Sequence, residues 1–155
     1  MAETEPAAAA PWLLCRAGRH LCALPLDRVA ETMRPLPIQP LAAAPPFVRG
    51  LCVHRGTPVP VVDAGMLLGQ SDARAERLVV IRTGDRMVAL AVADIVGVRP
   101  LTSASQALPP LLREAASAAV SAIGVLDEEL LLVLGTARIV PDALLEELAA
   151  AGPAP

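Results

Sequence analysis

The chain has 155 residues, a formal net charge of −3 and 13 basic residues, every one of which is arginine. A chain of this length suits one compact domain with its own hydrophobic core. The acidic balance and the small number of aromatic residues, Trp12 and Phe47, exclude the basic surface and the base-stacking platform of nucleic-acid binders. We therefore expect no nucleic acid as a partner.

The N-terminus and the cysteines bear on the cellular compartment. Residues 1–11 include an alanine run but carry Glu3 and Glu5 where a secretory signal would be positively charged, so we predict a disordered tail in a cytoplasmic protein. The apolar runs are shorter than the roughly 18 residues of a membrane span, so we expect no membrane insertion. An odd number of cysteines favours buried thiols in a reducing compartment over disulfides. These cysteines are Cys15, Cys22 and Cys52.

Short runs of valine, leucine and isoleucine, separated by glycine, proline and aspartate, recur along the chain and predict a mostly all-β domain. In chain order we expect strands near 12–17, 20–26, 32–38, 50–55, 58–62, 77–83, 86–93, 95–101, 121–127 and 130–135. Segments 35–46 and 101–119 are rich in proline and alanine and predict loops, the second with a helical turn at 111–116. A C-terminal helix is expected over 141–150, before a tail at 150–155.

The sequence also contains an internal repeat. The motifs RAGRH at 16–20 and RTGDR at 82–86 lie 66 residues apart, and each predicts a tight hairpin turn with a glycine at positive φ. A second similarity joins residues 50–68 to residues 124–140, because in both a strand, a turn, a second strand and a short helical run follow one another. The chain is therefore expected to contain two similar β units.

Each unit would have about 60 residues, which is small for an independent domain, so we expect the two to share apolar surface. We place them in tandem, roughly at 20–75 and 76–135. Strand 12–17 and the C-terminal helix would complete them, so that the whole domain spans 12–149.

The stretch FVRGLCVHRGTPVPVVD, residues 47–63, concentrates the candidate functional residues. Cys52 and His54 are two apart on a strand and share a face, as two metal ligands or a thiol and its base might. A nucleophile and its base usually converge from separate elements, and no Cys-x-x-Cys pair supports a metal site. We predict no catalytic residue, no metal and no cofactor, with a small Cys/His metal or thiol enzyme as the alternative.

Other residues of this stretch have structural interpretations. Gly50 begins a strand and Gly56 makes the hairpin turn. Pro58 and Pro60 share a face and indicate an edge strand, where missing N–H donors face solvent. Asp63 precedes AGMLL and is expected to cap a short helix.

Arg55 has two interpretations. It is either a solvated turn residue or an interface anchor, a role in which arginine is enriched. At this point the sequence resembles the CheW-like domain family, the coupling modules of bacterial chemotaxis. The resemblance rests on HRGTPVPVVD, on PPFVRG before it, on LDRVAE at 26–31 and on LAVADIVGV at 90–98, and it extends from about Trp12 to Leu148. It implies two SH3-like five-stranded β-barrel subdomains that share a core, with short helices and no catalytic centre.

The resemblance also implies a function and partners. Such adaptors couple chemoreceptors, the methyl-accepting proteins, to a CheA-type histidine kinase in cytoplasmic receptor arrays. One barrel pairs with the kinase's regulatory CheW-like domain, a groove between the barrels holds the helical hairpin of the receptor tip, and other CheW-like domains are possible partners. The expected partner-binding residues are Val29, Glu31, His54, Arg55 and Gly56, and the expected motif residues are Gly50, Pro60, Asp63 and Asp94.

The sequence departs from the family pattern at several positions. Val53 and His54 stand where the family usually has Asn-Leu, Thr32 follows Glu31 where an aliphatic residue is usual, and Ala64 replaces a leucine. A histidine beside Arg55 could make binding sensitive to pH, because imidazole titrates near pH 6.5. An alternative function is a divergent scaffold in another pathway, such as motility or development.

Overall fold

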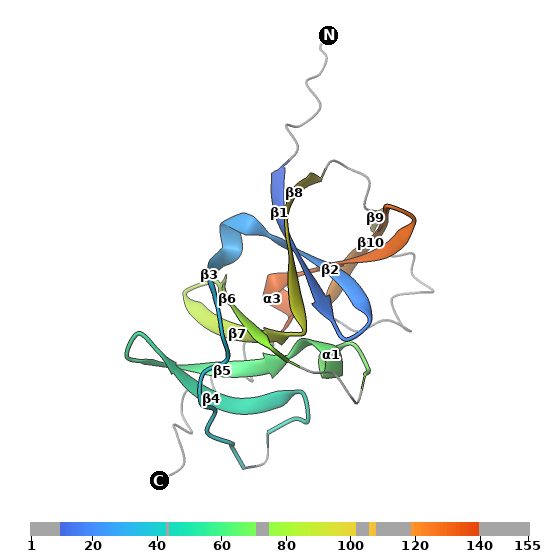
Figure 1. The fold of residues 1–155 in the computed structure, drawn as a ribbon. Helices are drawn as coiled ribbons and strands as arrows, with labels where there is room; N and C mark the ends of the chain where they lie inside the picture. Colours follow the sequence, from blue (N-terminus) through green and yellow to red (C-terminus); the bar gives the residue numbers. More distant parts are fainter. Residues whose placement is uncertain (1–9, 43, 71–74, 102–105, 108–118, 140–155) are drawn as a thin grey trace.

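A computed structural model describes residues 10–42, 44–70, 75–101, 106–107 and 119–139, which form two packed β-sheets (Figure 1). The strands are β1 (Ala10–Ala17), β2 (His20–Pro25), β3 (Val29–Met33), β4 (Val48–His54), β5 (Thr57–Asp63), β6 (Arg77–Thr83), β7 (Arg86–Val92), β8 (Asp94–Leu101), β9 (Gln106–Ala107), β10 (Val120–Leu126) and β11 (Glu129–Leu134). The helices are η1 (Leu26–Arg28), α1 (Ala64–Leu67) and α3 (Thr136–Ile139). The predicted mostly β fold is confirmed.

The local predictions differ from the structure mainly around the third strand. It ends at Met33 instead of running over 32–38, because Pro35 and Pro37 have no N–H group for a β ladder. The short strand β9 was not predicted. The predicted helix at 141–150 and the helical turn at 111–116 lie outside the described residues.

The first sheet, called sheet A, has six strands in the order β8-β1-β2-β11-β10-β9, and the second, sheet B, has five in the order β3-β6-β7-β5-β4. Both include one parallel pair, β11 with β2 in sheet A and β5 with β7 in sheet B. The predicted repeat is present, since both repeated hairpin turns have glycine at positive φ, Gly18 at 63° and Gly84 at 67°.

The two repeats are interleaved instead of standing in tandem. Hairpin β1–β2 of the first repeat joins β8, β10 and β11 of the second, while hairpin β6–β7 joins β3, β4 and β5. When each strand is replaced by its repeat partner, the order of sheet B becomes the order of sheet A without β9. The sheets therefore do not follow the expected division at 75/76, because β2 pairs with β11 and β7 pairs with β5 across that boundary.

Three clusters of buried side chains hold this arrangement together. The largest lies between the sheets and includes Leu13 and Leu24 from sheet A and Ile81 and Leu90 from sheet B. A second packs on the other face of sheet B, around Val80. A third packs on the other face of sheet A; its buried members are Leu14, Leu21, Ala23 and Leu131. Each sheet thus buries one of its apolar faces against the other sheet.

The cysteines are buried, as predicted. Cys15 and Cys22 are directly opposite each other on β1 and β2 within the cluster between the sheets. Burial raises the pKa of both thiols, that of Cys22 to about 12. Both residues therefore act as small apolar side chains at neutral pH.

Candidate partner-binding site

Arg55 and Gly56 form the two-residue turn between β4 and β5. Both have positive φ, 50° and 82°, which is the conformation of a type I′ hairpin turn. Glycine adopts it freely, whereas an arginine there is uncommon. Because the turn lies at the tip of the hairpin, the Arg55 side chain is 73% exposed.

Three nitrogen atoms contact a single oxygen of Glu31 on β3. His54 Nε2 lies 2.9 Å from Glu31 Oε1, and Arg55 donates to the same atom from Nε at 3.1 Å and from Nη2 at 3.0 Å. The hydrogen bond from His54 lowers the pKa of the Glu31 carboxyl most, and the hydrogen bonds from Arg55 lower it further. We call Glu31, His54 and Arg55 the Glu31 cluster.

The Glu31 cluster also shows how sheet B is closed. Strands β3 and β4 are at opposite edges of the sheet, yet Glu31 of β3 reaches His54 of β4. The chain after β3 continues this closure, because Gln39 and Leu51 exchange two backbone hydrogen bonds of 2.7 and 2.8 Å. Sheet B therefore curls until its edges meet, as in a barrel.

His54 and Cys52 are both buried on β4, two residues apart. The pKa of Cys52 is raised by burial, so its thiol is not an activated nucleophile, and the imidazole of His54 is bound to Glu31. Among the described residues, no three His, Cys, Asp or Glu side chains are grouped as metal ligands would be. The geometry gives the Cys/His enzyme alternative no support.

The structure brings Glu31, His54, Arg55 and Gly56 together and leaves two other expected residues apart. Val29 begins β3 and packs against the cluster between the sheets, on the other side of a register shift from Glu31. Asp94 begins β8 in sheet A, where it is exposed and opposite Arg16.

Asp63 is the helix cap that the sequence predicts. Its Oδ1 accepts a hydrogen bond of 3.0 Å from the Met66 amide, at the start of α1. Its Oδ2 accepts one of 2.8 Å from Arg49 Nε, a partner that the sequence did not indicate. The buried carboxylate thus joins α1 to β4.

The prediction of an edge strand at Pro58 and Pro60 is wrong for the strand as a whole. Strand β5 lies between β4 and β7. Pairing with β7, however, runs only from Val61 to Asp63, so both prolines lie where β4 is the paired neighbour. Their missing N–H groups therefore cost no hydrogen bond to β7.

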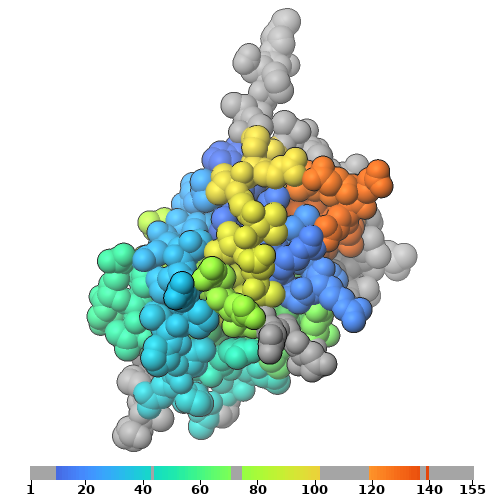
Figure 2. All heavy atoms as spheres, in the orientation of Figure 1, coloured from blue at the N-terminus to red at the C-terminus, as the bar shows by residue number. Residues whose placement is uncertain are grey.

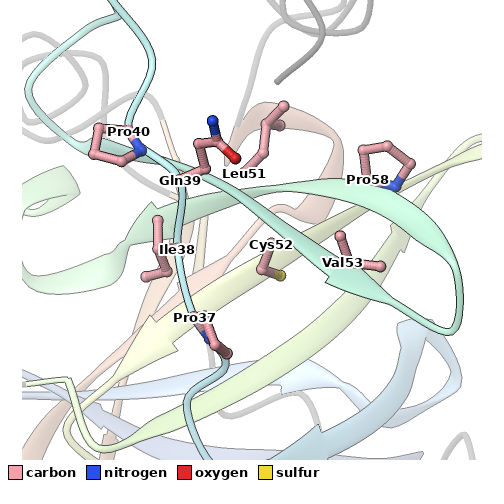
Figure 3. Close-up of a pocket in the computed structure, with 8 residues that line it drawn as sticks. All are labelled: Pro37, Ile38, Gln39, Pro40, Leu51, Cys52, Val53 and Pro58. Carbon is pink, nitrogen blue, oxygen red and sulfur yellow. The ribbon is translucent and has the colours of Figure 1, made fainter. Parts of the chain in front are cut away.

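An apolar pocket of about 530 Å³ lies beside β4, and Figure 3 shows its walls. It is lined by residues 37–40, 51–53 and 58, which come from the segment after β3 and from hairpin β4–β5. Val53 is 66% exposed there. The sequence did not indicate this pocket, because no local pattern places residues 37–40 against β4.

Sheet A has a matching hairpin, β10–β11, with an acidic turn. Asp127 and Glu128 both have positive φ, and Asp127 Oδ2 accepts a hydrogen bond of 2.9 Å from Arg99 Nη1 of β8. Val125 and Leu130, directly opposite each other near this turn, are exposed. Their counterparts in hairpin β4–β5 are Val53 and Pro58.

Further along sheet A, Arg16 of β1 forms an ion pair with Glu129, at the start of β11. This contact lowers the pKa of the Glu129 carboxyl. It ties hairpin β1–β2 to hairpin β10–β11 across the intervening strand β2.

The edge strand β8 is on the face of the molecule that Figure 2 presents to the viewer. Val96 and Val98 of β8 are exposed. Sheet A therefore exposes two apolar side chains at one of its edges.

The fold is thus a two-sheet β domain in which two equivalent hairpins carry ion-paired residues at their turns. Residues 11–144 match the model of the CheW-like domain family. The chain belongs to this family, whose members are non-enzymatic scaffolds or adaptors of chemotaxis-type signal transduction.

Two known proteins illustrate the relationship. The chain is 31% identical over 105 residues to protein FrzA from Myxococcus xanthus, which covers 66% of this chain and 66% of that relative. The fold is similar to the crystal structure of the scaffolding protein TtCheW from Thermoanaerobacter tengcongensis, with a TM-score of 0.73 and 19% identity over 82% of this chain and 89% of that one. Among the described residues, no helix has both the length and the apolar character needed to cross a membrane.

Proposed function

We propose that this chain is a cytoplasmic adaptor that couples chemoreceptors to a CheA-type histidine kinase. The observation that carries the proposal is the contact of Glu31 with Arg55, which holds an exposed guanidinium at the tip of hairpin β4–β5. An arginine fixed in this way can set the register of a partner, while apolar side chains nearby supply affinity.

The receptor side of the proposal rests on the edges of the two sheets. Val96 and Val98 are exposed on β8, an edge strand of sheet A, and Glu31 is on β3, an edge strand of sheet B. A helical hairpin with an apolar stripe and flanking charges matches such a surface. Val29 of β3, which is partly buried, would serve this contact by supporting the strand.

The kinase side rests on the exposed apolar residues of the hairpins. Val53 in sheet B and Val125 and Leu130 in sheet A are exposed apolar side chains that pairing with a second CheW-like domain would bury. Each contact is expected to bury roughly 1,200 Å² or less, so that firm assembly depends on several contacts acting together in an array.

Titration calorimetry with the kinase regulatory domain and with a receptor tip fragment tests the proposal. Arg55→Ala is expected to weaken receptor binding by roughly tenfold or more, as for an interface anchor, with little change in thermal stability. Arg82→Ala, at an exposed arginine of β6, is the matched control and should bind normally. Absence of binding to either partner contradicts the function, whereas full binding by Arg55→Ala removes Arg55 from the site.

The departures at Val53 and His54 favour one second candidate, a CheW-like scaffold for a motility or developmental pathway. The same surfaces would then bind a different kinase. Parallel titrations with the chemotaxis kinase and with the kinase of the other pathway separate the two functions, because the cognate regulatory domain should bind more tightly.

A further inference from the structure

Strand β4 has backbone groups that point away from its neighbour β5. In an antiparallel pair, residues alternate between pairs that exchange hydrogen bonds and pairs that do not, and the pair that closes a two-residue turn exchanges them. His54 and Thr57 close the turn of hairpin β4–β5. The next pair, Val53 with Pro58, therefore exchanges none, which suits a proline because it has no N–H to donate. The N–H and C=O groups of Val53 thus point outward, at the edge of sheet B.

The same edge of β4 already binds an extended segment at Leu51. Leu51 lies two residues before Val53, so its backbone groups point the same way, and it exchanges two hydrogen bonds of 2.7 and 2.8 Å with Gln39. Continuing that antiparallel register would place Pro37 opposite Val53, and a proline has no N–H for the next bond. Among the described residues, no backbone hydrogen bond from outside the strand ladders reaches Val53. The backbone of Val53 is therefore open to a further strand.

This open position borders the apolar pocket shown in Figure 3. Pro37, Ile38 and Cys52 line the pocket together with Val53, which is 66% exposed. Its volume of about 530 Å³ lies within the range of pockets that bind small ligands, and such pockets are mostly apolar. Side chains directly opposite each other in a sheet lie on the same face. An apolar residue paired with Val53 would therefore place its side chain beside Val53 at this pocket.

The turn that follows carries a positive charge held in place. In the described part of the chain, Arg55 donates to Glu31 from Nε and Nη2, so its Nη1 group is left for a second carboxylate. Residues two apart on a strand share a face. In a segment paired with Val53, a residue two positions away would consequently lie beside Arg55. An acidic residue there would gain a charge-assisted hydrogen bond while Arg55 keeps its contact with Glu31.

Sheet A has the same backbone arrangement with the opposite charge. Val125 of β10 holds the place in its hairpin that Val53 holds in hairpin β4–β5. The described residues of β9 pair with β10 further from the turn, so they do not cover Val125. The turn, however, consists of Asp127 and Glu128, which repel an acidic segment. The two hairpins therefore differ in the partner that they favour, and the one with Arg55 favours an acidic partner.

We propose that the edge of β4 at Val53 is a docking site for an extended segment of a partner protein, in which an apolar residue pairs with Val53 and an acidic residue two positions away contacts Arg55. The backbone hydrogen bonds would supply affinity, and the pocket and the arginine would select the side chains. This inference goes beyond the proposed function, because it depends on neither the kinase nor the receptor.

Nuclear magnetic resonance of the ¹⁵N-labelled full chain, titrated with the peptide acetyl-Asp-Thr-Leu-Thr-Asp-amide, tests the site. Its leucine has an aspartate two positions away on both sides, so the peptide suits either strand direction. We expect saturable shifts of the Val53 amide and Arg55 Nε–H signals at up to about 1 mM peptide, and none at Val125. Binding should weaken about tenfold or more when the leucine is N-methylated, or when both aspartates are replaced by asparagine.

Val53→Pro removes the outward N–H but no hydrogen bond to β5, so it should bind the peptide about tenfold more weakly or worse. Val125→Pro makes the same change in sheet A and is the matched control, which should bind normally. If Val53→Pro does not fold, the N-methylated peptide decides, because it leaves the protein unchanged.

Three outcomes overturn the proposal: no saturable shifts, equal binding of the N-methylated peptide, or shifts centred on Val125. Self-association of the chain that keeps the peptide from Val53 would assign this edge to a second copy and would also overturn it. No kinase or receptor is present in these titrations. Failure to bind either of them would therefore contradict the proposed function without affecting this result.

Discussion

Sheets A and B share one strand order, but the turns of two equivalent hairpins, β4–β5 in sheet B and β10–β11 in sheet A, carry different residues. In sheet B the turn carries Arg55 and is tied to Glu31, whereas in sheet A it carries Asp127 and is tied to Arg99, so the charges are reversed. His54 of sheet B corresponds to Leu126 of sheet A, which packs against an apolar cluster. The shared order sets the fold, and the ends of the hairpins distinguish the surfaces that partners can contact.

The largest expected effect concerns the curl of sheet B at Gly50. This residue has a φ of 143°, and a Cβ atom there would collide with the Gln39 carbonyl that bonds to Leu51. Gly50→Ala should lower the free energy of unfolding by about 3 kcal/mol or more, through backbone strain and overpacking. Gly97→Ala in sheet A has a similar φ but open space, and should cost about 1 kcal/mol. Urea denaturation measures both, and equal losses would contradict a special role for this contact.

Asp63 ranks second. Asp63→Ala removes the cap of α1 and leaves Arg49 without its carboxylate, so we expect a loss of about 2 kcal/mol in unfolding free energy. Asp63→Asn keeps the cap and should lose less. Chemical denaturation of both variants compares the two contributions, and an equal loss would show that the charge, not the cap, dominates.

Exchanging residue types between the two equivalent turns should have a smaller effect on stability. Glu128 has a φ of 67° without being glycine, whereas Gly56 holds the equivalent place in sheet B. Glu128→Gly should therefore stabilise the protein by about 1 kcal/mol, and Gly56→Glu should destabilise it by a similar amount. Thermal unfolding checks both signs; a stabilising Gly56→Glu would contradict the turn assignment.

The smallest effect is the dependence of stability on pH. The folded pKa of Glu31 lies below its unfolded value, so its contribution is fully present above the unfolded pKa of about 4.3 and is lost as pH falls through the folded pKa. In Glu31→Gln the unfolding free energy should fall less steeply with acid than in the wild type. Glu129→Gln should show the same sign, because Arg16 lowers the pKa of that carboxyl. If the unfolding free energy fell equally steeply with acid in the wild type and in both variants, the lowered pKa values of Glu31 and Glu129 would be contradicted.

The sequence predicts those parts of the fold that depend on neighbours in the chain. The turns at Gly18 and Gly84 follow from local residue types, and so does the cap at Asp63. The sequence does not predict that each sheet contains strands of both repeats. Pairs such as Val61 with Ala89 depend on tertiary packing, which the alternation of apolar residues along a strand does not encode. For the same reason the sequence could not show β5 as an interior strand.

The candidate site was predictable to a similar extent. Glu31, Arg55 and Gly56 came from the family resemblance, and the structure places them together. The contact of His54 with Glu31 required the closure of sheet B, since the two residues stand on strands at opposite edges. The repeat relates the turn at Asp127 to the turn at Arg55, so an ion pair of Asp127 could have been expected. The charges at the two turns are opposite, however, and the sequence therefore did not indicate that Arg99 pairs with Asp127.

The interleaving of the two repeats has a consequence for biosynthesis. Sheet B can assemble once the ribosome has released residues up to Val92, whereas hairpin β1–β2, made first, must wait for β10 and β11 at the far end of the chain. At ordinary translation rates this delay lasts roughly 5 to 20 seconds. During that time the apolar faces of β1 and β2 lack part of the cover that they have in the folded protein, and such exposed surface favours aggregation.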